Sequence, residues 1–340
     1  MGISFTQVGF LIPGNFSEDD PLTGLEQTLD IIARGEALGY DSAWVRQRHL
    51  ERGVSSAATF LAAATQRTHR IGLGTAVIPL GYENPFRLAE DLATVDVLSR
   101  GRLNVGVSAN PPQFGALLGD LLYDGDPAQA DYGHGRAERL ARALRSEPLA
   151  EEAVAGNAAG AQVPRLQPIA EGLTERLWYG GGSLKSAEWS GRNGWHMLTG
   201  NIVTGETTDD FLTAQAGLIA RFLANWRGPV APRIALGRVI LPLDSATPAQ
   251  RRRYRDYVAS RHARTLAPQG PKRTLFGADI IGTLDEIAAA LARDPIAQRV
   301  SEFRLELPYE FPHEDYVQIV EDFARLLPQI RPVPLRRTGS

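Results

Sequence analysis

Hydrophobic and polar positions follow two alternating periods along this chain, one typical of strands and the other of helices. Short apolar runs such as Arg102–Val107 predict strands, whereas Leu22–Leu38 and Phe211–Trp226 place their apolar residues at helical spacing. The two kinds of segment alternate from end to end. Eight strands are predicted, at Ile3–Ile12, Asp41–Val45, Arg70–Ile78, Arg102–Val107, Leu177–Tyr179, Trp195–Leu198, Arg233–Leu241 and Glu302–Leu307.

Regular strand–helix alternation is typical of the α/β class and favours a single (β/α)8 TIM barrel with insertion segments. The right-handed crossover rule makes such a repeat geometrically natural, and a doubly wound two-domain protein is the competing fold. Residues 148–172, rich in Ala, Gly, Glu and Pro, keep no steady period and predict an irregular surface excursion. We therefore expect one barrel domain over residues 1–330 and a flexible tail, rich in Pro and Arg, over residues 331–340.

Composition narrows the classes of function. Hydrophobic residues make up 43% and charged residues 22%, with a net charge of −3, which gives no electrostatic basis for binding nucleic acid or an anionic membrane. The chain has no cysteine, and its six histidines show no metal-binding spacing, so we expect no metal site. No apolar stretch approaches a membrane span of roughly 18–20 residues. Gly2–Pro13 lacks the basic start of a secretory signal, so we expect a cytoplasmic enzyme.

Residues that follow the strands of a parallel barrel meet at one face, so we expect catalytic and binding residues in the loops there. The segment W-V-R-Q-R-H-L, Trp44–Leu50, places Arg46, Arg48 and His49 directly after the second predicted strand. Three basic groups at the end of a barrel strand are expected when their side chains face a ligand. A solvated loop with a helix-capping role is the equally simple alternative.

Two further segments combine small and polar residues after a strand. Gly74–Pro85 begins with Gly, Thr and Ala, which allow a planar group to approach the backbone closely. Gly101–Pro112 places Ser108 and Asn110 after the fourth strand, where their polar groups point to the same face. Ordinary strand packing and a plain turn remain alternatives for these two segments.

The glycine run W-Y-G-G-G-S-L-K-S, Trp178–Ser186, gives the strongest signal. Glycines between a strand and a helix expose backbone N–H groups at the positive end of the helix, and Ser183 and Ser186 add hydroxyls, as an anionic phosphate requires. A glycine-rich turn with Ser183 as the helix N-cap is the alternative. The chain has neither G-x-G-x-x-G after its first strand nor G-x-x-x-x-G-K-[ST], so a Rossmann dinucleotide site and a P-loop are unsupported.

These segments together resemble the luciferase-like monooxygenase superfamily along nearly the whole chain. The most specific stretch is Arg70–Val107, which includes A-E-D and D-V-L-S-R-G-R. The run L-W-Y-G-G-G-S, followed by S-A-E-W, is similar to the family's phosphate-binding turn, and Gly282–Ile287 is similar to its late G-T-P-E-E helix start. Each motif alone is weak, but their order and spacing are specific.

The resemblance implies a flavin-dependent oxidoreductase, a monooxygenase that uses reduced FMN and O2 to oxidise a small organic substrate. It further implies a separate flavin reductase and a homodimer. The family's non-proline cis peptide beneath the flavin ring corresponds to Ala76–Val77, and the residue near the reactive flavin carbon corresponds to Ser108. The implied phosphate site centres on Gly181–Ser186, with Gly182 and Ser183 as its main pair and Ser186 one helical turn on.

One departure from the family pattern affects the proposed catalytic residues. The family often has E-H-H after W-x-x, with its first histidine at the active site, whereas this chain has Gln47, Arg48 and His49. Arginine cannot serve as a general base, but it can hold an anionic peroxide or a substrate carboxylate. His49 then becomes the candidate for proton transfer because its pKa lies nearest neutrality.

Two other functions fit the same sequence. A deazaflavin-dependent hydride-transfer oxidoreductase places a tricyclic ring and a phosphate similarly, although its longer acidic tail requires extra basic groups at the barrel mouth. A non-catalytic flavin-binding protein is the alternative from another class, and a polar substrate cavity around Arg48 and His49 would argue against it. No sequence feature selects the substrate.

Overall fold

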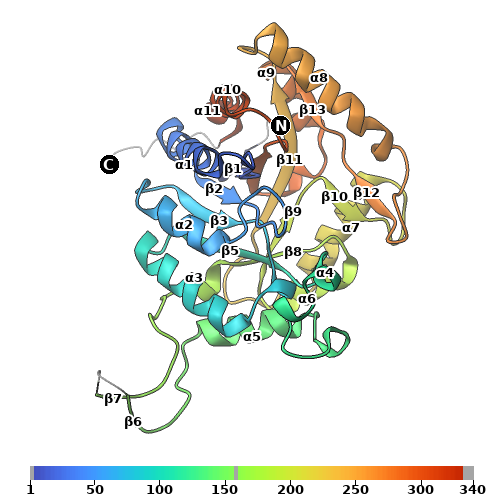
Figure 1. Ribbon diagram of the computed structural model, residues 1–340. Helices are drawn as coiled ribbons and strands as arrows, with labels where there is room; N and C mark the ends of the chain where they lie inside the picture. Colours follow the sequence, from blue (N-terminus) through green and yellow to red (C-terminus); the bar gives the residue numbers. More distant parts are fainter. Residues whose placement is uncertain (1–3, 157–159, 332–340) are drawn as a thin grey trace, which may run out of the picture.

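The computed structural model describes residues 4–156 and 160–331 and shows strands enclosed by a ring of helices (Figure 1). Within these residues, a closed barrel of parallel strands confirms the predicted (β/α)8 fold. Each barrel strand overlaps one expected from the sequence. These strands are β1 (Gln7–Ile12), β2 (Ser42–Val45), β3 (Gly72–Thr75), β5 (Leu103–Ser108), β8 (Leu177–Gly180), β9 (His196–Thr199), β11 (Ile234–Pro242) and β14 (Glu302–Glu306).

The barrel strands are arranged in the order β11-β14-β1-β2-β3-β5-β8-β9, and β9 pairs with β11 to complete the circle. Ala235 of β11 lies opposite Leu198 on one side and Glu302 on the other. Because neighbouring strands run parallel, the loops after their carboxyl ends gather at one mouth of the barrel.

The outer ring consists of amphipathic helices that cover the apolar outer surface of the barrel. Several of them begin at side chains that accept backbone N–H groups, including Ser183 and the capping box of Thr283 with Glu286. The helices are α1 (Pro21–Leu38), α2 (Ala57–Thr65), α3 (Pro85–Ser99), α4 (Gly115–Leu118), α5 (Gly135–Leu144), α6 (Leu184–Arg192), α7 (Phe211–Ala224), α8 (Pro248–His262), α9 (Leu284–Arg293), α10 (His313–Ala324) and α11 (Leu327–Ile330).

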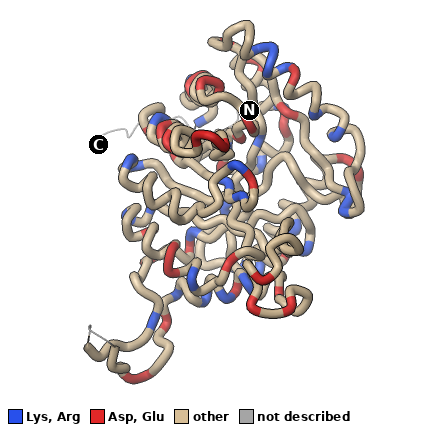
Figure 2. Tube along the Cα trace, viewed as in Figure 1, with Lys and Arg blue, Asp and Glu red and all other residues tan. Residues whose placement is uncertain are grey.

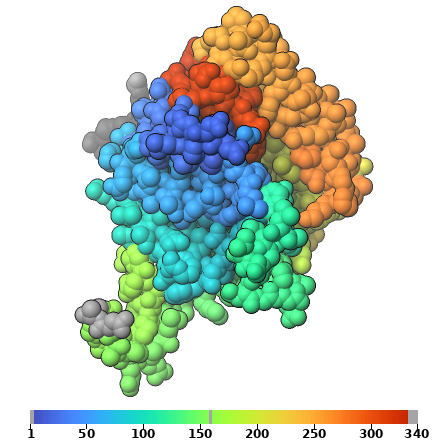
Figure 3. All heavy atoms as spheres, in the orientation of Figure 1, coloured from blue at the N-terminus to red at the C-terminus, as the bar shows by residue number. Residues whose placement is uncertain are grey.

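Short strands outside the barrel wall were not expected from the sequence. Of the segment 148–172, the described residues, 148–156 and 160–172, form a surface excursion. It leaves the body of the molecule at the lower left of Figures 1 and 3 and includes a small antiparallel pair. A second antiparallel pair joins β10 to β12, while β4 and β13 extend the barrel sheet. These strands are β4 (Ile78–Pro79), β6 (Val154–Ala155), β7 (Ala161–Gln162), β10 (Ile202–Thr204), β12 (Thr274–Phe276) and β13 (Ile280–Gly282).

Two buried tryptophans occupy the barrel interior. The rings of Trp44 and Trp178 lie 5.5 Å apart, edge to face, within an apolar cluster separate from the main core between strands and helices. The indole N–H of Trp44 donates to Ser42, and that of Trp178 donates to Asn104. Burying these rings is therefore compatible with satisfying their polar atoms.

The surface carries basic and acidic positions interspersed along its helices (Figure 2). In the part of the chain that the structure describes, no helix is long and apolar enough to cross a membrane. Of the expected tail, Arg331 donates to the carbonyl of Gly39 and pairs with Asp41, whereas residues 332–340 lie outside the described residues.

We expect the protein to lose stability in mild acid because of His196. Its Nδ1 accepts from the backbone N–H of Arg233, and its Nε2 lies 3.0 Å from the carbonyl of Glu175. Burial, reinforced by the charge of Arg233, lowers the pKa of His196 to about 4 from 6.5. The native state therefore binds fewer protons than the unfolded state between these values, so stability falls as the pH falls from 6.5 to 4, by on the order of 3 kcal/mol.

Urea unfolding of the wild type and of His196→Gln across this pH range checks the prediction. The variant should be less stable at pH 7 but should show a flatter dependence on pH. Equal slopes for the two proteins would show that His196 is not responsible.

We expect Gly106 to be intolerant of any side chain. A Cβ at this position would overlap the carbonyl oxygen of Thr75 in the neighbouring strand and lie 2.6 Å from Leu198. Gly106→Ala should therefore lower the free energy of unfolding by about 1–3 kcal/mol, the usual cost of overpacking. Gly217→Ala is the matched control, because a Cβ there meets open space on α7, and this variant should gain roughly 0.5–1 kcal/mol. Equal unfolding midpoints for the two variants would contradict the close approach at Gly106.

Candidate functional site

The carboxyl ends of β3, β5 and β8 bring three of the predicted segments together. The Ala76–Val77 peptide is cis, as the resemblance implies, and a Cβ at Gly180 would lie only 2.6 Å from Val77. Ser108 ends β5 opposite Pro79. Residues far apart in the sequence therefore share one side of the barrel mouth.

Tyr179 connects the carboxyl ends of these strands, the floor of the site, to the start of α6. Its hydroxyl accepts the backbone N–H of Ala109, which follows Ser108, and also interacts with the side chain of Ser186. Burial raises the pKa of Tyr179, so the phenol stays neutral and can donate as well as accept. The hydroxyl thus fixes the distance between the end of β5 and the glycine turn.

The glycine turn ends at Ser183, which is the N-cap of α6. Its Oγ accepts the backbone N–H of Ser186, and the two hydroxyls lie 2.9 Å apart. A Cβ at Gly181 would lie 2.5 Å from that of Ser186, and Gly182 accepts the N–H of Thr204. The capping interpretation of Ser183 is therefore correct, and it leaves both hydroxyls together at the positive end of the helix.

The donors at this helix start are partly used. The backbone N–H of Leu184 donates to the carboxylate of Glu206, whereas that of Lys185 has no hydrogen-bond partner among the described residues. An anion binding here would meet Ser183, Ser186 and the Lys185 N–H, but it would also lie near a negative charge. Glu206 is exposed and can turn towards solvent.

Arg48 and His49 diverge instead of facing one point. Arg48 turns towards the loop after β14, where its Nη2 donates to the hydroxyl of Tyr309 at 2.6 Å. Its guanidinium also lies over the Tyr309 ring and 4.0 Å from Glu51. The sequence leaves open which of the two residues turns inward. In the structure, the two side chains belong to separate clusters, Arg48 with Tyr309 and His49 with Tyr82.

His49 belongs to the cluster beside β3. Its ring stacks on Tyr82 at 3.9 Å, and its Nε2 lies 2.9 Å from the amide nitrogen of Gln47. That amide also donates to Glu83, so the His49 Nε2 accepts and the proton of the neutral ring lies on Nδ1. Burial lowers the pKa of His49 and raises that of Glu83, which favours the neutral form of both groups.

Several polar residues at the mouth were not singled out from the sequence. The sequence points to Arg46 together with its neighbours. It does not point to Glu306, the partner of Arg46 260 residues away, or to Arg304 and Tyr309. Arg46 pairs with Glu306 at 3.1 Å and also lies over the ring of Tyr309. The alternation E-F-R-L-E in β14 was the available signal, because it places charges on the face of the strand that points into the barrel.

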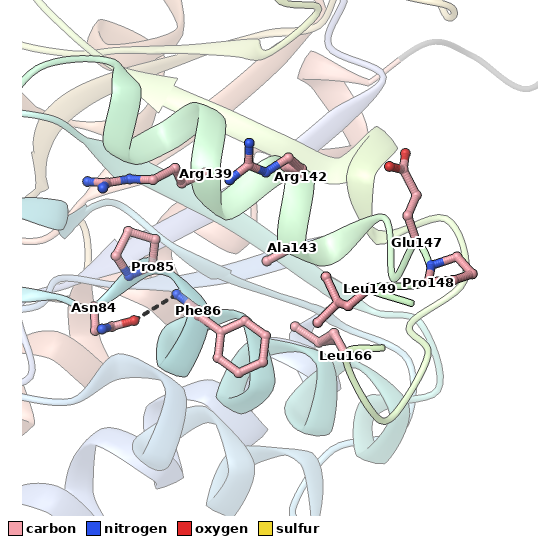
Figure 4. A pocket seen from close by; sticks show the side chains of 10 residues that line it. All are labelled: Asn84, Pro85, Phe86, Arg139, Arg142, Ala143, Glu147, Pro148, Leu149 and Leu166. Atoms are coloured by element: carbon pink, nitrogen blue, oxygen red, sulfur yellow. Dashed lines mark hydrogen bonds between the residues drawn. The ribbon is translucent and has the colours of Figure 1, made fainter. Parts of the chain in front are cut away.

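Two hollows show where ligands could fit. A cavity of about 610 Å³ opens beside the carboxyl ends of β1, β2 and β14, with Pro13, Arg48 and Tyr309 in its lining. A smaller one of about 330 Å³ lies outside the barrel between the start of α3, α5 and the surface excursion, with Phe86 and Leu149 in its lining (Figure 4). Of these two hollows, the larger adjoins the strand ends; a third, of about 520 Å³, is lined by Tyr82 and Glu83 just after β4. No cluster of three metal-ligating side chains occurs in residues 4–156 and 160–331.

Comparison with known sequences gives one family match and several partial relatives. The model of the family described as luciferase-like monooxygenase matches residues 6–302. Limonene 1,2-monooxygenase of Rhodococcus erythropolis is 38% identical over 31% of this chain and 27% of its own length. The 4-hydroxyprotoasukamycin monooxygenase of Streptomyces nodosus subsp. asukaensis is 35% identical over 35% of this chain and 32% of its own length. The similar segments thus cover about a third or less of each relative.

Solved structures share the fold along nearly the whole chain. Apo-MsnO8 has a TM-score of 0.69 and 19% identity, covering 96% of this chain and 99% of its own. The oxygenating constituent of 3,6-diketocamphane monooxygenase from Pseudomonas putida, in complex with FMN, has a TM-score of 0.68 and 14% identity, with 98% and 100% coverage. An F420-dependent secondary alcohol dehydrogenase in complex with an F420-acetone adduct has a TM-score of 0.65 and 18% identity, covering 96% of this chain and 100% of its own.

The family match begins just before β1 and extends to the first residue of β14, and it includes the cis peptide, the glycine turn and the start of α6. The chain therefore belongs to the luciferase-like monooxygenase family.

Proposed function

We propose that this protein is an FMN-dependent monooxygenase that oxidises a small organic substrate with O2. The observation that carries the proposal is the contact between Val77 and Gly180, which places the cis peptide directly beside the glycine turn. A ring lying on Ala76–Val77 and Ser108 would then have its phosphate end within reach of Ser183. FMN, when bound, supplies the electrons that activate O2.

The phosphate end of the site fits a compact anion. The hydroxyls of Ser183 and Ser186 and the N–H of Lys185 all lie in the first turn of α6, where the helix dipole favours negative charge. Gly181 and Gly182 keep the approach free of side chains. Glu206 must move away from the N–H of Leu184 when a phosphate binds.

Charges around α6 do not separate FMN from a deazaflavin with a longer acidic tail. A cavity of about 540 Å³ beside this helix is lined by Lys185, Arg192 and Arg221 among others. Arg192 and Arg221 share the single carboxylate of Glu188, at 2.6 and 2.9 Å, so the lining keeps a net positive charge. This charge suits an acidic tail, and together with the F420-dependent relatives it keeps hydride transfer from F420 as the second candidate.

Residues at the opposite wall are suited to managing protons and anions. His49 stays neutral at pH 7 because burial lowers its pKa, and its ring can accept a proton at Nε2 once the Gln47 amide releases that atom. Arg48 keeps its charge and holds the hydroxyl of Tyr309 in place. Arg48 and Tyr309 line the cavity of about 610 Å³, and this polar lining argues against a flavin-binding protein without catalytic activity. Reduced FMN from a separate reductase and a homodimeric assembly complete the proposal.

Titration of the protein with FMN, reduced FMN and F420, followed by rapid mixing of each reduced complex with O2, tests this function. Micromolar binding of reduced FMN and an oxygen reaction distinct from that of free reduced FMN would support it. Preferential binding of F420 without an oxygen reaction would transfer the assignment to hydride transfer, and binding of neither would overturn both.

We expect Ser183→Asp to weaken FMN binding tenfold or more, about 1.4 kcal/mol. Aspartate preserves the N-cap, so the helix should persist, but its charge repels a phosphate at close range. Fluorescence titration of FMN measures the effect. Ser56→Asp is the matched control, because Ser56 caps α2 in the same way but is not part of the glycine turn. Unchanged affinity in Ser183→Asp would place the phosphate elsewhere.

We expect replacement of His49 and of Arg48 to change different kinetic constants. His49→Ala should lower turnover by about 10²–10⁴, the usual contribution of a positioned acid or base, with FMN affinity nearly unchanged. Arg48→Ala should chiefly raise the KM for the substrate. Steady-state oxygen consumption with supplied reduced FMN measures both effects, and Arg255→Ala, at an exposed position on α8 outside the cavity lining, is the control. Full activity in both single variants and in the double variant would reduce this loop to a structural role.

A further inference from the structure

Three arginines along one wall of the barrel have buried nitrogens without partners. They are Arg46 after β2, Arg48 two residues on, and Arg304 inside β14. Among the described residues, the Nε atoms of all three and the Nη1 of Arg304 have no hydrogen-bond partner. Arg304 is 3% exposed and lies over the ring of Trp44, 5.2 Å from its centre. Buried guanidinium N–H groups without acceptors are costly, so their accumulation at one place requires a reason.

The carboxylates nearby do not balance this charge. Glu306 accepts from Arg46 at 3.1 Å, and its carboxylate fills the space that side chains at Gly200 and Gly237 would need. Glu302, which lies deeper in the barrel, is already paired with Arg233. Glu306 is thus the one buried carboxylate in contact with this wall in the described chain.

The outer part of the wall is therefore positive. Arg304 lies one inward position below Glu306 on the same strand, where the charges of Glu306, Arg46 and Glu302 all act on it. The hydroxyl of Tyr309 accepts a hydrogen bond from Arg48. Two buried carboxylates, Glu306 and Glu302, thus act on the three arginines, and Glu302 is shared with Arg233. An exposed carboxylate, Glu51, lies 4.0 Å from Arg48 at the rim.

We propose that this wall recognises an anionic organic substrate through its acidic group, most simply a carboxylate, with Arg46 and Arg48 as its ligands. The inference rests on the proposed function in treating the bound molecule as the substrate. The guanidinium carbons of Arg46 and Arg48 lie 5.1 and 5.5 Å from the centre of the Tyr309 ring, and the proposed place of the acidic group is beside that ring, between the two arginines. Arginine suits this task because its planar donors match two carboxylate oxygens.

Room for the rest of such a molecule adjoins the wall. The cavity of about 610 Å³ beside Arg48 and Tyr309 is also lined by Pro13, Phe16 and Leu50, which offer an apolar surface. Its outer lining carries Glu18, Glu51 and Glu310, all exposed. These carboxylates disfavour a second negative charge, so a monoanion with an apolar body fits better than a dianion such as a phosphate monoester.

Binding of matched acids and amides to the protein without flavin tests the proposal directly. Benzoate and octanoate are compared with benzamide and octanamide by isothermal titration calorimetry, with the fluorescence of the protein's tryptophans as a second readout. We expect each acid to bind at least about tenfold more tightly than its amide. Equal affinities for acid and amide, or binding of neither, would overturn the proposal.

Variants locate the binding group. Arg46→Gln should abolish the preference for acids, Arg46→Lys should keep part of it, and Arg255→Gln, at an exposed position on α8 outside the cavity lining, should leave it unchanged. Circular dichroism and the melting temperature show whether each variant is folded. If Arg46→Gln fails to fold, Arg48→Gln becomes the decisive variant. An acid preference that survives both replacements would refute the assignment of this wall.

The same variants separate this inference from the cofactor assignment. Arg46→Gln should keep its affinity for FMN, whereas Ser183→Asp should lose FMN but keep the preference for acids. A protein that binds F420 in place of FMN, yet discriminates acids from amides through Arg46, would overturn the monooxygenase proposal and leave the anion site in place. The opposite result would remove the anion site alone.

Discussion

Closure of the barrel depends on β11, the strand that pairs with β9 on one side and β14 on the other. It is nine residues long and buried throughout, and its register places Ala235 between Leu198 and Glu302. Once this strand completes the circle, every carboxyl end is directed to the same mouth. The contact between Val77 and Gly180 and the neighbouring position of Ser108 follow from that geometry, because β3, β5 and β8 are consecutive in the closed wall.

The fold could be predicted because each repeating unit carries its own periodic signal. Most barrel strands are short apolar runs, β14 alternates charged and apolar residues, and several helix starts are marked by local caps such as Ser183 and Thr283. The strand pairs β6–β7 and β10–β12 were missed because strands of two or three residues show no period. Their pairing is set by chain segments that come together only in the folded protein.

The candidate site was predictable only in part, for a related reason. Position after a strand and a glycine run indicated the floor and the helix start, which depend on local sequence. The pairing of Arg46 with Glu306 and of Arg48 with Tyr309 joins residues about 260 positions apart, and no local pattern specifies such contacts. The separation of Arg48 from His49 likewise depends on Tyr82 and Tyr309, which lie on different loops.

Charge inside the barrel is distributed unequally between its two ends. At the amino end, Glu302 is held by Arg233, whose guanidinium also lies over Trp178, and these partners satisfy one another. At the carboxyl end, Arg46, Arg48 and Arg304 retain unpaired donors although the same strand supplies Glu306. A protein selected only for stability would pair or remove such groups, because an unpaired buried charge is strongly unfavourable. Departures from that rule are expected where structure is held ready for a ligand. In this barrel the unpaired donors of Arg46, Arg48 and Arg304 lie along one wall, and Arg48, which sets this chain apart from its family's usual pattern, also lines the cavity at the mouth.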